Sequence, residues 1–200
     1  VSIESGSVIA GHWEYATDQP SYVLFLQPTG KIALFASANG VATFGKDTAT
    51  PIQLNVWSHV AGVFDLPSQT LRVYVNGGSE TVLPVTMAKP HPIAGTQLHL
   101  GNYPTQDASQ ASFLGLLHDV RFSSVARYTS PFKPEVKLTS DGSTFALFHL
   151  DETSGTTASD ASSNANTATL KNGAKFGAPP SCSGSGGAAG SVGSAGASNL

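Results

Sequence analysis

Short apolar segments separated by turn residues constrain the fold of this 200-residue chain more than any other feature of its sequence. Nearly every such segment is rich in Val, Phe, Tyr, Leu or Thr and ends at Gly, Pro, Asn or Asp. This pattern is typical of β-strands joined by tight turns, and helical periodicity is almost absent. We therefore expect an all-β fold, a two-sheet antiparallel β-sandwich of jelly-roll type.

Two hairpins are predicted from their turn residues. Residues 22–26 and 31–35 flank a loop in which Pro sets φ and Gly accepts a positive φ. Residues 71–75 alternate in polarity, and Asn76 and Gly77 form a strong turn signal before a further strand at 80–83.

Other strands are predicted at 41–44, 56–64, 97–100, 115–122, 145–150 and 167–170. The segment 56–64 has apolar side chains on both faces, so it is expected to be an inner strand with Trp57 in the core.

Residues 178–200 differ in composition from the rest of the chain. Gly, Ser and Ala dominate them, which predicts a flexible tail or linker after a sandwich that covers residues 1–177. The only cysteine, Cys182, lies in this tail, so an internal disulfide is excluded. Its thiol is either idle or bonded to another module or chain.

The charge and hydropathy of the chain exclude two classes of partner. The net charge is −3 and basic residues do not cluster, so no nucleic-acid partner is expected. No apolar run approaches the ~20 residues that cross a bilayer, so no membrane insertion is expected. The chain begins at Val1 without a leader, and we expect that a signal peptide was removed or lies outside it.

Four sequence segments resemble a known family: residues 55–65, 71–77, 98–101 and 113–122. Together, in this order, they resemble the laminin-G-like jelly roll of the concanavalin A-like lectin/glucanase superfamily, over roughly residues 8–127. The resemblance implies an extracellular or cell-surface module. That superfamily includes lectins, adhesion modules and glycanases, so the resemblance alone does not decide the function.

The segment 145–176 departs from the family pattern. Within it, residues 147–155 and 160–166 are similar to the opening of family members, yet they stand near the C-terminus. Three alternatives are open. The segment closes this sandwich from the other end, begins a truncated second module, or pairs with a neighbouring copy.

The carboxylates do not predict an enzyme. Glycoside hydrolysis needs two carboxyl groups that face one cleft, and glycanases of the superfamily often carry them in one strand as Glu-x-Asp-x-x-Glu. No such pattern occurs here. The six histidines also lack the spacing of a zinc site. We therefore expect no catalysis.

A calcium site is one interpretation of a loop-rich stretch near the C-terminus. Its candidate ligands are Asp151, Glu152, Asp160, Asn164 and Asn166, because Ca²⁺ prefers carboxylate and carbonyl oxygens. Asp119 is a more distant candidate. The alternative is that these side chains stabilise turns by bonding to their own backbone.

The candidate ligand-binding residues are Trp13, Tyr15, Asn102 and Tyr103, because aromatic rings stack on sugars and amides bond to their hydroxyls. We expect a non-catalytic binding or adhesion module that recognises a glycan or an extracellular protein through loops at one end of the sandwich. The alternative is a structural subunit of a surface fibre that self-associates through its C-terminal segment. A third interpretation is an accessory domain of a secreted hydrolase.

Overall fold

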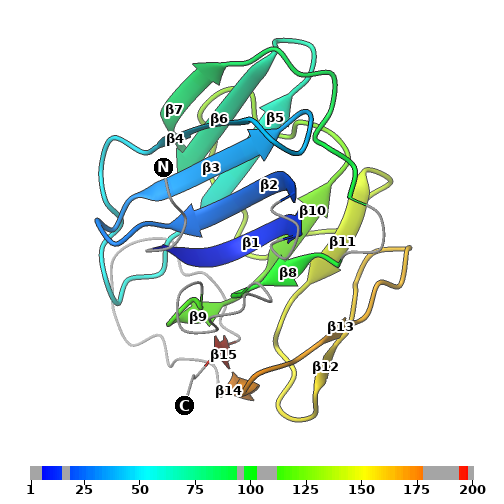
Figure 1. Cartoon of the computed structure of the whole chain (residues 1–200). Helices are drawn as coiled ribbons and strands as arrows, with labels where there is room; N and C mark the ends of the chain where they lie inside the picture. The colour runs from blue at the N-terminus through cyan, green and yellow to red at the C-terminus, as the bar shows by residue number, and fades with distance from the viewer. Residues whose placement is uncertain (1–5, 15–18, 94–96, 103–111, 178–193, 198–200) are drawn as a thin grey trace. The chain divides into compact units, whose positions relative to one another are not determined.

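A computed structural model describes residues 6–14, 19–93, 97–102, 112–177 and 194–197 (Figure 1). Every regular element in these ranges is a β-strand, which confirms the predicted all-β class. Within the same ranges there is no helix that could span a membrane.

The chain divides into two compact units. The larger unit comprises residues 1–113 and 126–134, and the smaller unit comprises residues 114–125 and 135–200. The predicted extent of one sandwich, residues 1–177, stays a prediction. So do the three alternatives for the segment 145–176.

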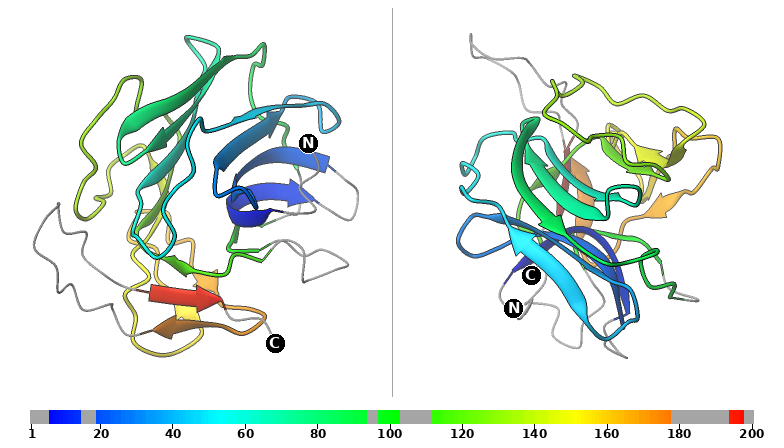
Figure 2. Two further views of the ribbon diagram at one scale, coloured as in Figure 1. Left: turned by 90° about the vertical axis from the view of Figure 1, so that its left-hand side faces the viewer. Right: turned by 90° about the horizontal axis from the view of Figure 1, so that it is seen from above.

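The larger unit consists of two antiparallel sheets, which form separate layers in Figure 2. One sheet has the order β4-β3-β2-β1-β8, and the other has the order β5-β6-β7. The strands are β1 (Ser7–Glu14), β2 (Gln19–Leu26), β3 (Ile32–Ser37), β4 (Thr43–Asp47), β5 (Val60–Asp65), β6 (Thr70–Val75), β7 (Gly78–Pro84) and β8 (His99–Leu100).

Both predicted hairpins form. β2 pairs with β3 from Tyr22–Ala36 to Leu26–Ile32, and the loop between them is closed by a bond from the Gly30 amide to the Gln27 carbonyl. Asn76 and Gly77 join β6 to β7 with φ angles of 50° and 79°. Two consecutive positive φ angles match the right-handed twist of the strands they connect.

Two predicted strands begin later than their sequence pattern indicated. β4 begins at Thr43 rather than at Val41, because the Asn39 Oδ1 accepts bonds from the amides of Val41 and Ala42 and holds them in a turn.

The strand predicted at 56–64 begins only at Val60. Val60 pairs with Val75, the last residue of β6, so the residues before it have no neighbouring strand. Trp57 is consequently exposed, at 45% of its surface, and the prediction that it lies in the core was wrong.

The core of the larger unit is built around β3, in which every residue is buried. On one face of its sheet, Val23 lies opposite Phe35 and Phe25 lies opposite Ala33, in a cluster that also contains Val8 and Trp13. On the other face, β5 approaches closely, because a Cβ on Gly62 would lie 2.9 Å from the Leu34 side chain.

The smaller unit contains only short strands. They are β9 (Leu116–Leu117), β10 (Val120–Ser123), β11 (Thr144–Phe148), β12 (Thr157–Ala158), β13 (Ala168–Thr169), β14 (Ala174–Gly177) and β15 (Ser194–Ala197). They form three antiparallel groups: β10 with β11, β12 with β13, and β14-β15-β9.

Two features of the smaller unit differ from the sequence predictions. The strand predicted at 115–122 is interrupted, because Asp119 takes a φ of 50° between β9 and β10. In addition, residues 194–197 of the predicted flexible tail form β15 and pair with β14 and β9. The other tail residues, including Cys182, lie outside the described residues.

Candidate functional site

Trp13, the first candidate for ligand binding, lies in the core of the larger unit. It is the penultimate residue of β1 and only 7% of its surface is exposed. Its ring packs in the cluster with Val23 and Phe25, where no ligand can stack on it. The prediction of Trp13 as a ligand contact is therefore corrected: the β1 register turns this side chain inward.

The other three candidates for ligand binding are not brought together by the described residues. Tyr15 and Tyr103 lie outside them. Asn102 is half-buried after β8, and its Oδ1 is buried with no hydrogen-bond partner among the described residues. The binding role of these residues stays a prediction.

Asp160, a candidate calcium ligand, is the hydrogen-bonded centre of a loop in the smaller unit. Its Oδ1 accepts the amides of Leu147 and Ser162, both at 2.8 Å. Its Oδ2 accepts the Ser162 hydroxyl at 2.7 Å and the Asn166 amide at 2.8 Å. Burial alone would raise the pKa of Asp160, but these donors outweigh it and lower the pKa from 3.8 to about 2.

Asn164 and Asn166 also hold the loop through their side chains. Their Nδ2 groups donate to the Phe145 carbonyl at 3.0 and 2.9 Å. A calcium ion needs several oxygen atoms with free lone pairs that converge on one point. Here both Asp160 oxygens already accept two donors each, so this cluster does not fit Ca²⁺.

Asp151 and Glu152, the remaining calcium candidates, point to other partners. Asp151 is exposed and lies 3.4 Å from the Lys137 ammonium. The Glu152 Oε1 accepts the Ser159 amide at 2.7 Å. Within the described ranges, no group of three or more His, Cys, Asp or Glu side chains could hold a metal ion.

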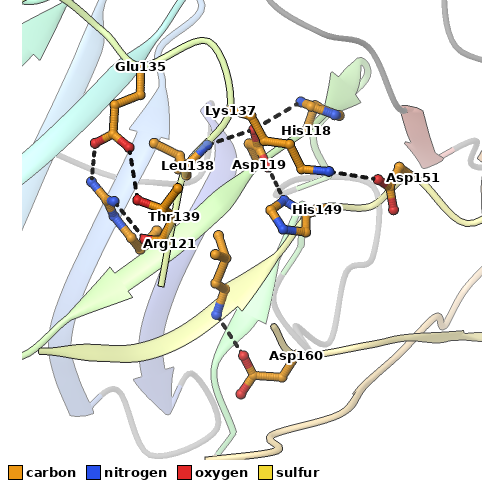
Figure 3. Close-up of polar contacts among 11 residues, drawn as sticks. His118, Asp119, Arg121, Glu135, Lys137, Leu138, Thr139, His149, Asp151 and Asp160 are labelled. Atoms are coloured by element: carbon orange, nitrogen blue, oxygen red, sulfur yellow. Dashed lines mark hydrogen bonds and ion pairs between the residues drawn. The ribbon is translucent and has the colours of Figure 1, made fainter. Parts of the chain in front are cut away.

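Among the described residues of the smaller unit, Asp119 and His149 form the shortest contact between an acidic and an imidazole side chain (Figure 3). The His149 Nδ1 lies 2.5 Å from the Asp119 Oδ1, and the Asp119 Oδ2 accepts the Leu138 amide at 3.1 Å. His118 lies 3.8 Å from the same carboxylate, and burial lowers its pKa although Asp119 opposes this effect.

The Asp119–His149 pair links the β9–β10 turn to the end of β11. An Asp–His pair activates a nucleophile only when a hydroxyl or thiol lies within reach of the imidazole. Among the described residues, the His149 ring bonds only to Asp119. The backbone bond from the Asp119 amide to the His149 carbonyl joins the same two segments. Asp119 therefore holds together the β9–β10 turn, the end of β11 and residue 138.

A groove in the larger unit offers a better ligand site. It lies where β4 and β7, the outermost strands of the two sheets, approach one another (Figure 1). Its volume is about 590 Å³, within the range of small-ligand sites. We call it the β4–β7 groove. Its lining residues are Lys31, Phe35, Gly45, Lys46, Asp47, Thr48, Ala49, Thr81 and Val82.

Hydrogen bonds fix the walls of the β4–β7 groove. The Thr81 hydroxyl donates to the Asp47 carbonyl at 2.8 Å and so joins β7 to β4. The side-chain Nε2 of Gln27 donates to the Asp47 Oδ1 at 2.6 Å. Thr48 is buried, and its hydroxyl donates to the Thr50 carbonyl at 2.8 Å and accepts the Ile32 amide. The Asp47, Thr48 and Thr81 side chains are therefore positioned before any ligand arrives.

The base of the groove depends on a glycine. A Cβ on Gly45 would lie 2.2 Å from Cδ1 of Phe35, its partner across the strands, so the ring lies directly against the Gly45 backbone. The half-exposed Val82 gives the groove an apolar surface, whereas Phe35 is buried in the core. This mixture of apolar and polar lining suits a ligand with both kinds of surface.

None of the candidate ligand-binding or calcium residues predicted from the sequence lines this groove. One signal could have found it, because an isolated glycine within a strand often marks a close approach of backbone or ligand. Gly45 is such a glycine, and Lys46 and Asp47 follow it. The convergence with Thr81 could not be predicted, since it depends on how two sheets pack.

The sequence matches the model of the concanavalin A-like lectin/glucanases superfamily over residues 4–130. The chain belongs to this superfamily. The resemblance and the predicted sandwich of concanavalin A-like type are thereby confirmed. Comparison with curated proteins found no match.

Two solved structures are similar to the chain. A protein from Bacteroides ovatus that is proposed to bind carbohydrate has a TM-score of 0.58 and 18% identity, over 84% of this chain. The chain spans half the length of that protein, and the likeness shows the fold alone. An S-layer domain-containing protein from Clostridium thermocellum has 18% identity and a TM-score of only 0.32, over 64% of this chain and 61% of its own.

Proposed function

We propose that this chain is a non-catalytic, extracellular binding module that holds a glycan in the β4–β7 groove. The observation that carries the proposal is the groove itself, which combines hydrogen-bonded polar groups with the exposed apolar side chain of Val82. Sugars present hydroxyl groups at their edges and C–H groups on their faces, so they require this mixture.

The carboxylates of the groove support binding rather than hydrolysis. A glycosidase needs two carboxyl groups on either side of the scissile bond. The lining of the β4–β7 groove contains one, Asp47, and the Gln27 amide already holds its Oδ1. Membership in a superfamily that includes glucanases therefore does not imply hydrolysis in this groove.

A glycan array tests the proposal with a variant that fills the groove. Ala49 is an exposed residue of the lining, and Ala49→Trp would place an indole where the ligand is expected. Ala88→Trp is the matched control, because Ala88 is also exposed in the larger unit but lies outside the lining. We expect the unmodified chain and Ala88→Trp to bind a glycan and Ala49→Trp to lose it.

Two outcomes would contradict the proposal. One is an unmodified chain that retains its fold and binds no glycan on the array, and the other is an Ala49→Trp variant that binds as tightly as the unmodified chain. The melting temperatures of all three proteins establish that any loss reflects the groove rather than unfolding.

Self-association is the second candidate function. The observation that favours it is a set of exposed apolar side chains in the smaller unit, whose burial against a second copy would be favourable. These side chains are Leu114, Leu116, Val125, Val136 and Phe145.

A further inference from the structure

Two lysines give the β4–β7 groove an excess of positive charge. Lys31 is half-buried immediately before β3, and Lys46 is exposed on β4. Among the described residues, neither ammonium group forms an ion pair or a side-chain hydrogen bond. Ammonium groups that face a concave site without a protein partner attract anionic ligands.

The carboxylate of the groove does not cancel this charge. Asp47 contributes one negative charge against the two positive charges of the lysines. Its Oδ1 accepts the Gln27 amide, so part of its hydrogen-bonding capacity is already used. The lining thus carries an excess of one positive charge in a chain whose net charge is −3.

The remaining polar groups of the lining leave the lysines as its principal donors. The Thr48 and Thr81 hydroxyls already donate to the carbonyls of Thr50 and Asp47. A ligand with negatively charged oxygens would therefore find its strongest partners at Lys31 and Lys46, because hydrogen bonds between ionised groups are stronger than neutral ones.

We infer that the ligand of the β4–β7 groove is an acidic saccharide, with its carboxylate or sulfate groups bound by Lys31 and Lys46. This inference rests on the proposed function and specifies its ligand class. The ring face of the sugar would lie toward Val82, and the charged groups toward the lysines. Neutral sugars of the same size would bind more weakly.

Isothermal titration with three probes tests the inference on the full chain. The probes are a galacturonate trisaccharide, its methyl ester, which has the same rings without the charges, and a sulfated neutral trisaccharide. We expect at least one charged probe to bind about tenfold more tightly than the ester, and its affinity to fall as salt is raised. The probe that binds identifies carboxylate or sulfate as the recognised group.

Charge-matched double variants locate the binding. Lys31→Gln with Lys46→Gln should weaken the charged probe about tenfold and leave the ester unchanged. Lys89→Gln with Lys133→Gln removes the same charge from exposed positions of the larger unit outside the groove, and it should bind as the unmodified chain does. Arginine at positions 31 and 46 should restore most of the affinity.

The failures of the two proposals can be distinguished. If the ester binds as tightly as both charged probes, the groove is a glycan site and only the inference of an acidic ligand is wrong. If no saccharide binds, the proposed function fails with it. If a glutamate peptide of equal charge binds as tightly as the saccharides, the lysines recognise polyanions in general and the inference is also overturned.

Discussion

At the residue scale, Asp160 holds its loop in place, because its carboxylate accepts four hydrogen bonds from three residues of the chain. Two of these donors are backbone amides of Leu147 and Asn166, on either side of it in sequence. The loop between β12 and β13 therefore depends on this side chain in the way a turn depends on its first Asx residue.

Replacing Asp160 should destabilise the protein in a pH-dependent way. Its pKa falls from 3.8 to about 2 on folding, so the carboxylate stabilises the fold above about pH 4 and loses this contribution as the pH falls toward 2. We expect Asp160→Asn to cost about 1 to 3 kcal/mol at pH 7.

Thermal melts between pH 2 and pH 7 measure this effect. The melting temperature of Asp160→Asn should fall less steeply below pH 4 than that of the unmodified chain. Asp151→Asn is the control, since Asp151 makes an exposed ion pair with Lys137 and its loss should change stability by less than about 1 kcal/mol. Equal melting curves for both variants would show that the four donors do not stabilise the loop.

The two tryptophans should differ sharply in their contribution to stability. Trp13→Ala removes a ring from the core of the larger unit and should cost about 3 to 5 kcal/mol. Trp57→Ala removes an exposed ring and should cost less than about 1 kcal/mol. Urea unfolding, followed by the remaining tryptophan in each variant, compares them; the opposite order would contradict the assigned burial.

These tryptophans show what a residue-level pattern can and cannot predict. Both tryptophans have apolar residues near them in the sequence, so their burial depends on neighbouring strands. Trp57 is exposed because β6 ends at Val75, opposite Val60, and does not extend alongside residue 57, which the alternation of residues 56–64 cannot reveal. The turn role of Asp160, in contrast, was one of the two alternatives that its sequence context allowed.

At the scale of elements, the β6–β7 hairpin depends on the backbone of Gly77. Its φ of +79° is strained for any other residue, and a Cβ would lie only 1.8 Å from the Phe132 carbonyl oxygen. The Gly77 carbonyl also accepts the Phe132 amide at 2.9 Å, so the segment 126–134 packs against this turn.

Gly77→Ala should therefore destabilise the larger unit by more than about 2 kcal/mol, through strain and the displacement of residue 132. Gly142→Ala is the matched control, because a Cβ there would meet no atom within 4 Å. Circular dichroism melts of both variants measure the difference. A Gly77→Ala protein as stable as its control would mean that the turn tolerates a side chain.

Hairpins joined by short loops were the elements best predicted from sequence. Local turn chemistry determines such pairs, as Asn76 and Gly77 illustrate. The strands β12 and β14 were missed because two to four residues carry too little periodicity to be recognised. The β4–β7 groove was missed for a different reason, since its walls belong to different sheets and meet only through tertiary packing.

At the scale of the whole molecule, the exposed apolar side chains of the smaller unit predict a concentration-dependent mass. We expect light scattering to detect self-association that Leu114→Glu with Phe145→Glu abolishes, because both residues are exposed and charge opposes their burial against a partner. Val41→Glu with Leu54→Glu is the control, since these exposed apolar residues lie in the larger unit. A strictly monomeric chain at high concentration would exclude the structural role.

The hydrogen bond from the Thr81 hydroxyl to the Asp47 carbonyl links ligand binding in the groove to mechanical stability. It ties together the outermost strands of two different layers, and a ligand that contacts both strands would add a second tie at the same seam. Since such a ligand would bind only while the layers stay together, its affinity would add directly to the work needed to separate them. A tighter ligand would then also make the two sheets of this protein harder to separate by force.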